Sequence, residues 1–202
     1  MSTDTVIHRI VRPAVRRIAR TRVTPNHLTT LRVATGLAAA AAFAAGGPWP
    51  AIGGAVFVLS MLLDRADGEL ARQTGRSSRF GHWYDIVGDC LCNMLALFGI
   101  GIGLWDTLGA LGPLLGAVAG AGVGVMFWEI HGLRLAEARG YQLRPGVVVD
   151  PDDALVLVPV FVWTGAAAPM LVAAAVITPL ASVWLALRAG RRTEERAGQR
   201  RS

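Results

Sequence analysis

Long apolar stretches, interrupted by short polar or glycine-rich breaks, occupy most of this chain. A helix that spans a bilayer needs about 20 mostly apolar residues. The pattern predicts six such helices, at residues 26–46, 49–73, 80–104, 108–136, 152–166 and 168–189. The fifth is the shortest and ends at Gly165, so five spans are the alternative. We therefore expect an all-α integral membrane fold, with a six-helix transmembrane domain over residues 23–190.

The two ends of the chain have different patterns. Residues 1–22 alternate arginines with apolar residues such as Val6, Ile10 and Val15, which predicts an amphipathic helix rather than a cleaved leader. We expect this juxtamembrane helix to lie on the cytoplasmic membrane surface; the alternative is a solvated helix packed against the domain. Residues 191–202 are basic and almost devoid of apolar side chains, so they are predicted to form a disordered tail.

Arginines are distributed unevenly among the connections. The arginine-rich segments are residues 9–22, 72–79, 134–144 and 188–201, whereas the breaks near Gly46, Trp105 and Gly165 contain no arginine. The positive-inside rule therefore predicts that both termini lie in the cytoplasm, which an even number of spans explains better than an odd one. The expected location is a bacterial inner membrane, with any site near residues 64–89 facing the cytoplasm.

Composition narrows the possible classes of protein. A chain with 53% hydrophobic residues and a mean hydropathy of +0.46 is too apolar for an ordinary soluble domain. A pI near 10.8 could suggest a nucleic-acid binder. The basic residues, however, flank the predicted spans, and no nucleic-acid-binding motif accompanies them. We therefore expect membrane lipids, and no nucleic acid, as partners.

Four aspartates lie where an apolar chain tolerates them least. Asp64 and Asp67 are three residues apart, and Asp85 and Asp89 are four apart, so each pair lies on one face of its helix. If the chain reverses between the pairs, the four carboxylates converge. Close carboxylates repel one another unless a cation separates them, and carboxylate oxygens are the ligands that hard divalent cations prefer. The spacing predicts a metal site formed by all four aspartates.

These residues belong to a longer pattern. From Asp64 the chain reads Asp, two residues, Asp-Gly, two residues, Ala-Arg, eight residues, Gly, three residues, Asp, three residues, Asp. This run resembles, at every defined position, the signature of the CDP-alcohol phosphotransferase family. The segment from Thr24 to Arg32 is also similar to the family's approach to its first transmembrane helix. The resemblance implies an enzyme of phospholipid biosynthesis, and a homodimer.

The resemblance also implies a reaction. An acceptor alcohol attacks the phosphorus of a CDP-linked alcohol donor, a phospho-alcohol (phosphatidyl) group is transferred, and CMP is released. Two Mg²⁺ or Mn²⁺ ions would be held by Asp64, Asp67, Asp85 and Asp89. By the same resemblance Asp89 is the catalytic proton acceptor, as base, as metal ligand or as both. Transfer of a polar headgroup phosphate from a CDP-headgroup to a lipid acceptor is the alternative.

The nucleotide contacts are inferred in the same way. By resemblance, small side chains admit the cytidine diphosphate and an arginine faces a phosphate; the residues are Gly68, Ala71, Arg72 and Gly81, with hydrogen bonds from Asn26 and Thr29. Arg72 has an alternative role as a positive-inside flank. For Asn26 and Thr29 the alternative is capping of the first span. The roles of Glu129, Asp152 and Asp153 stay open between structural pairing and substrate contact.

Two further features bear on function. Ile86 and Cys90 follow the third and fourth aspartates, where many phosphatidylglycerophosphate synthases have proline and lysine, which disfavours that subfamily. Glu69 after the motif glycine is more similar to members that use inositol-type or other polar headgroups. A metal-ion transporter or a nucleotide-binding membrane protein is the non-enzyme alternative. Transport is disfavoured because the acidic residues cluster at one membrane depth rather than along a path.

Overall fold

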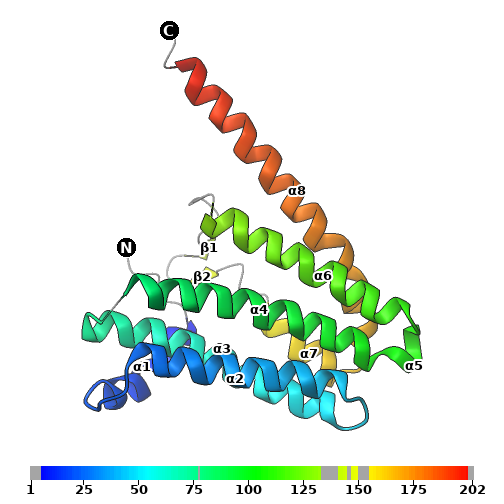
Figure 1. Cartoon of the computed structure of the whole chain (residues 1–202), viewed down its shortest axis with the longest axis horizontal. Helices are drawn as coiled ribbons and strands as arrows, with labels where there is room; N and C mark the ends of the chain where they lie inside the picture. The colour runs from blue at the N-terminus through cyan, green and yellow to red at the C-terminus, as the bar shows by residue number, and fades with distance from the viewer. Residues whose placement is uncertain (1–5, 77, 133–140, 145–146, 150–154, 200–202) are drawn as a thin grey trace.

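The computed structural model describes residues 6–76, 78–132, 141–144, 147–149 and 155–199. The chain is almost entirely helical within these ranges (Figure 1). The elements are α1 (Val6–Ile18), α2 (Pro25–Ala44), α3 (Trp49–Thr74), α4 (Arg79–Gly103), α5 (Trp105–Leu108), α6 (Leu111–Phe127), the π-helix η1 (Trp128–Gly132), β1 (Tyr141–Arg144), β2 (Val147–Val149), α7 (Leu157–Trp163) and α8 (Ala167–Gln199).

Four of the described helices are long and apolar enough to cross a membrane. They are α3, α4, the stretch Leu111–Ile130 and the stretch Ala167–Arg188. Large apolar side chains on these helices point outward, among them Leu91 on α4, Leu114 on α6 and Ile177 on α8. Such a surface suits hydrocarbon rather than water. The prediction of an all-α integral membrane fold is therefore confirmed, apart from the antiparallel hairpin of β1 and β2, which sequence analysis missed.

The predicted spans match the observed helices unevenly. The second and third predicted spans agree with α3 and α4 to within one residue at each end. The fifth differs: within its described part, α7 has only seven residues, about 10 Å of helix at 1.5 Å per residue. It ends before Gly165, whose φ of 73° is left-handed and breaks the helix. The described residues thus contain four candidate spans rather than six.

The helices pack closely around a narrow apolar core. Helix α2 packs against both α3 and α4, and α6 packs between α4 and α8 (Figure 1). Phe43 of α2 and Phe57 of α3 are almost fully buried, with ring centroids 6.1 Å apart. At Gly116 of α6, a Cβ would lie only 2.6 Å from the backbone oxygen of Leu97 on α4. Helix backbones approach this closely only where a residue has no side chain.

The N-terminal helix packs on the domain. Val11 and Val15 of α1 are buried against Leu28 of α2 and Leu70 of α3. Its apolar face is thus directed at protein, which is the alternative considered for residues 1–22. Arg12 Nε also lies 3.4 Å from Glu69 Oε1 on α3. This contact places α1 against the helix that carries the first two aspartates.

The predicted disordered tail is wrong for residues 191–199. Helix α8 continues to Gln199, and its C-terminal part projects away from the other helices in Figure 1. The sequence of this part contains Arg, Glu, Ala and Gln, which are all good helix formers. Low hydrophobicity therefore does not by itself exclude a helix.

Candidate functional site

A tight reversal between α3 and α4 brings the two aspartate pairs together. Helix α3 ends at Gly75, whose φ of 65° is left-handed. Helix α4 then begins after Ser78, whose side-chain oxygen accepts a hydrogen bond from the backbone N–H of Gly81 at 2.9 Å. Both features are local, and together they turn the chain so that the aspartates of α3 and α4 face one another beside α2, which packs against both helices.

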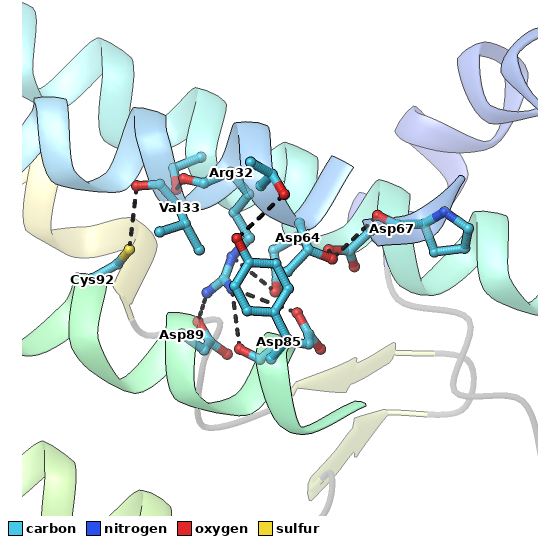
Figure 2. A network of polar contacts seen from close by, with 12 residues as sticks. Arg32, Val33, Asp64, Asp67, Asp85, Asp89 and Cys92 are labelled. Atoms are coloured by element: carbon cyan, nitrogen blue, oxygen red, sulfur yellow. Dashed lines mark hydrogen bonds and ion pairs between the residues drawn. The ribbon is translucent and has the colours of Figure 1, made fainter. Parts of the chain in front are cut away.

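Three of the four aspartates form a common cluster. Asp64, Asp67 and Asp85 each contribute a carboxylate oxygen, and these oxygens all lie within 4.8 Å of one another. Figure 2 shows the three side chains converging between α3 and α4. Asp89 lies next to the cluster but outside this group of oxygens. Three hard oxygen donors at this separation fit a divalent cation such as Mg²⁺ or Mn²⁺.

Arg32 of α2 is the central cation of the site, and sequence analysis did not single it out. Its side chain is only 3% exposed. Its Nε lies 3.2 Å from Asp64 Oδ1, its Nη1 lies 3.5 Å from Asp85 Oδ1, and its Nη2 donates to Asp89 Oδ1 (Figure 2). One guanidinium therefore contacts three of the four carboxylates. The sequence did contain a sign of this role, because an arginine within an apolar helix needs polar or charged partners.

Asp67 is the most buried of the three clustered aspartates and has its own partner. It is 4% exposed, and Thr29 Oγ1 donates a hydrogen bond to its Oδ2 at 2.8 Å. The capping alternative for Thr29 is wrong, because Thr24 is the N-cap residue of α2. The backbone N–H of Thr24 also donates to His27 Nδ1 at 3.3 Å. Thr29 thus orients a carboxylate of the motif.

The small residues of the motif have different surroundings. Gly68 is exposed, and a Cβ built there would meet no atom within 4 Å. At Gly81 a Cβ would lie 2.7 Å from Asn26 Oδ1, so this glycine lets Asn26 pack against the start of α4. Ala71 is half-buried one turn before Gly75. Of the two motif glycines, only Gly68 therefore has an open surface on which a ligand could bind.

Arg72 has a protein partner and remains accessible. Its side chain is 50% exposed, and Nη2 donates to Glu69 Oε2 at 2.8 Å. Glu69, which is buried, also accepts a hydrogen bond from Gln73 Nε2 at 2.8 Å. Glu69 thus fixes the orientation of Arg72 while leaving part of the guanidinium exposed.

A small pocket lies beside Asp89. It is lined by both polar and apolar residues, which are Arg32, Phe57, Ser60, Met61, Asp64, Arg65, Asp89, Cys92, Asn93 and Leu155. Asn93 Nδ2 donates to Asp89 Oδ1 at 3.4 Å. The pocket therefore reaches the fourth aspartate from the core of the helix bundle.

Of the three acidic residues whose roles stayed open, one lies among the described residues. Glu129 belongs to η1 and is buried, and its Oε2 has no hydrogen-bond partner within the described part of the chain. It does not line the pocket beside Asp89. Asp152 and Asp153 lie outside the described residues. The site is thus built from α2, α3 and α4.

Fold and site define an all-α membrane protein with a carboxylate cluster between two facing helices. A family model described as CDP-alcohol phosphatidyltransferase matches residues 22–141, which is more than half of the chain. The chain belongs to this family, so the resemblance stated from the motif is confirmed.

Two curated relatives share part of the chain. A bifunctional IPC transferase and DIPP synthase of Aquifex aeolicus (strain VF5) is 36% identical over 90 residues, which are 42% of this chain and 20% of that protein. An archaetidylinositol phosphate synthase of Pyrococcus horikoshii (strain ATCC 700860 / DSM 12428 / JCM 9974 / NBRC 100139 / OT-3) is 35% identical over 92 residues, which are 44% and 48% of the two chains. The matched part thus spans between a fifth and about half of these relatives.

A solved structure shares the fold over most of the chain. It is the crystal structure of Mycobacterium tuberculosis phosphatidylinositol phosphate synthase (PgsA1) with CDP-DAG bound, with a TM-score of 0.65 and 21% identity. The alignment covers 89% of this chain and 91% of that one. The apo form of the same protein gives a TM-score of 0.63 at 22% identity. At this level of identity the likeness establishes the fold.

Proposed function

We propose that this protein is a metal-dependent phospholipid-biosynthetic transferase. It moves a phospho-alcohol (phosphatidyl) group from a CDP-linked donor to an alcohol acceptor and releases CMP. The observation that carries this proposal is the cluster of Asp64, Asp67 and Asp85, whose oxygens lie within 4.8 Å of one another beside the open face at Gly68. Family membership supports the same reaction class.

The carboxylates have the chemistry to hold Mg²⁺ or Mn²⁺. Asp64, Asp67 and Asp85 would bind one ion, and Asp89 would complete the site for a second. Asp85 Oδ1 is buried and accepts no hydrogen bond within the described residues, as expected of an oxygen suited to a cation. Bound metal would neutralise the diphosphate charge, which is the main electrostatic requirement of this transfer.

The remaining motif residues are proposed to receive the cytidine diphosphate. Gly68 and Ala71 leave room beside the aspartates, and Arg72 has an exposed edge that could bind a phosphate. From α2, Asn26 packs against Gly81 at the start of α4, and Thr29 holds Asp67 in place. We infer that these contacts shape the nucleotide pocket.

Asp89 is proposed as the proton acceptor. The acceptor hydroxyl would reach it from the neighbouring pocket, transfer its proton to the carboxylate and form a new oxygen–phosphorus bond. The bond between that phosphorus and the oxygen of CMP would break, and CMP would leave with the electron pair. The site would also hold the attacking oxygen, the phosphorus and the departing oxygen of CMP in line.

The names of the relatives suggest which substrates to test first. Both a curated relative and the solved structure are named as inositol phosphate lipid synthases, and the latter is titled with CDP-DAG bound. We therefore propose CDP-diacylglycerol as donor and a phosphorylated inositol as acceptor. Transfer of a polar headgroup from a CDP-headgroup to a lipid is the alternative.

The proposed setting is a bacterial inner membrane, with the site facing the cytoplasm. We propose six passages, with α2 and the segment around α7 added to the four candidate spans, because the arginine-rich connections then lie on one side. A homodimer is proposed from the family resemblance.

The experiment is CMP release by protein in lipid nanodiscs with Mg²⁺ or Mn²⁺. CDP-diacylglycerol is offered with inositol phosphate, inositol or glycerol phosphate, and CDP-linked headgroups are offered with diacylglycerol. One pair should give metal-dependent release, and D67N or D85N should lower it to below about one hundredth. The matched control D106N, at an exposed position of α5, should keep wild-type activity. Full activity of D67N and D85N would contradict the metal assignment.

A further inference from the structure

Arg32 contacts three of the four aspartates, and the proposed reaction assigns it no role. Figure 2 shows its guanidinium between α2 and α4, with Asp64 and Asp85 on one side and Asp89 on another. The Nε and Nη1 atoms face Asp64 and Asp85, whereas Nη2 faces Asp89. Because a guanidinium is planar and rigid, it holds these carboxylates at fixed relative positions.

The backbone around Arg32 fixes it in turn. Ser60 Oγ of α3 donates to the backbone oxygen of Arg32 at 2.9 Å, and Arg32 Nη1 lies 3.4 Å from the backbone oxygen of Asp85. Gly88 of α4 lets α2 approach here, since a Cβ at this position would lie 2.6 Å from Val33 Cγ2 and 3.6 Å from Arg32 Nη1. The arginine is therefore built into the contact of three helices rather than extended toward solvent.

Asp89 is held apart from the other three aspartates by this arrangement. Its Oδ1 accepts from Arg32 Nη2 on one side and from Asn93 Nδ2 at 3.4 Å on the other. The oxygens of Asp64, Asp67 and Asp85 meet within 4.8 Å without it. The site thus has two parts, a three-carboxylate cluster and a separate carboxylate beside the pocket.

We propose that Arg32 is a positioning residue that keeps Asp89 out of the three-carboxylate cluster of the first ion, so that Asp89 stays directed at the second ion and the acceptor alcohol. This inference rests on the proposed transfer reaction. The charge of Arg32 also offsets one of the four negative charges and thereby limits the attraction of the cluster for cations. Loss of Arg32 should let Asp89 join the cluster, which would tighten metal binding while slowing transfer.

The test uses R32Q and R32K in nanodiscs, with Mn²⁺ binding followed by electron paramagnetic resonance and transfer followed by CMP release. R32Q should bind Mn²⁺ about tenfold more tightly, because a nearby positive charge is lost. Its turnover should fall about tenfold or more, with a smaller change in the apparent KM for the donor. R32K keeps the charge but not the fork, so its Mn²⁺ affinity should stay within about threefold of wild type while its turnover falls.

The double variant R32Q/D89N has the same net charge at the site as the wild type, and it tests whether Asp89 is needed for the tighter binding in R32Q. If Asp89 supplies the extra metal ligand in R32Q, this double variant should lose the tightening, by about tenfold relative to R32Q. Weaker Mn²⁺ binding in R32Q, or wild-type turnover in both single variants, would overturn the inference. If R32Q does not fold, R32K decides: retained Mn²⁺ affinity with reduced turnover supports positioning, and unchanged turnover overturns it.

Failure of the proposed function would be visible separately. If wild-type protein releases no CMP from any pair, the transferase proposal fails. The Mn²⁺ titration then decides the role of Arg32 alone, because tightening in R32Q that disappears in R32Q/D89N supports it and unchanged binding overturns it.

Discussion

Replacement of Gly68 by alanine tests whether the open face of the aspartate motif is a ligand surface. Gly68 lies one helical turn after Asp64 and is exposed. A Cβ at this position meets no atom within 4 Å, so the added methyl group fits the protein without rearrangement. If a nucleotide approaches the helix here, the methyl group obstructs the ligand and nothing else.

The expected changes in stability and binding have opposite signs. Alanine in place of glycine within a helix stabilises it by about 0.5–1 kcal/mol, because the unfolded chain has less conformational freedom to lose. For a chain of this size, 1 kcal/mol raises the melting temperature by about 2–4 °C. The affinity for CDP should fall about tenfold, which corresponds to about 1.4 kcal/mol.

The measurements are thermal unfolding in detergent and calorimetric titration with CDP in the presence of Mg²⁺. G116A is the matched control, because a Cβ at Gly116 would lie 2.6 Å from the backbone oxygen of Leu97 and 2.9 Å from Phe98 Cα. This control should lose about 1–3 kcal/mol of stability and keep its CDP affinity when folded. Wild-type CDP affinity in G68A would refute the placement of the nucleotide at Gly68.

Two other predictions follow from single contacts, and a third follows from the topology. T29V removes the donor of the 2.8 Å hydrogen bond to Asp67 and should weaken Mn²⁺ binding about tenfold by paramagnetic resonance; unchanged binding would show that Thr29 does not orient Asp67. L70A opens a cavity in the fully buried contact of Leu70 with Val15 and should cost about 2–5 kcal/mol in thermal unfolding, with CDP affinity retained. A reporter fused after Ser202 should be cytoplasmic, and a periplasmic reporter would exclude an even number of passages with a cytoplasmic N-terminus.

Much of the fold could be predicted because the helix ends are set by residues close to them in the sequence. The predicted ends at residues 73 and 80 lie next to the observed ends of α3 and α4, where Gly75 and the Ser78 cap stop and restart the helix. The convergence of Asp64, Asp67 and Asp85 was also predictable, since helical spacing and one reversal suffice to produce it.

The missed features depend on tertiary contacts or on segments with mixed signals. Composition made residues 152–166 resemble a span, but only seven residues of α7 are α-helical in their described part. The packing of α1 on α3 required knowledge of the partner, since the same apolar face could have met lipid. Arg32 was missed because an arginine near an arginine-rich flank has the same sequence pattern whether it faces phospholipid or aspartates.

The first long helix explains why the segment from Thr24 to Arg32 accompanies the aspartate motif. Thr29, Arg32 and Gly36 recur at three- and four-residue steps, so they share the face of α2 that meets α3 and α4. Thr29 binds Asp67, Arg32 binds the other aspartates, and Gly36 leaves space where a Cβ would lie 2.8 Å from Cys92 Cβ. The carboxylates come from α3 and α4, but their orientations are set from α2. A substitution of Thr29 or Arg32 should therefore alter metal binding, whereas a substitution of Gly36 should first weaken the packing of α2 against α4.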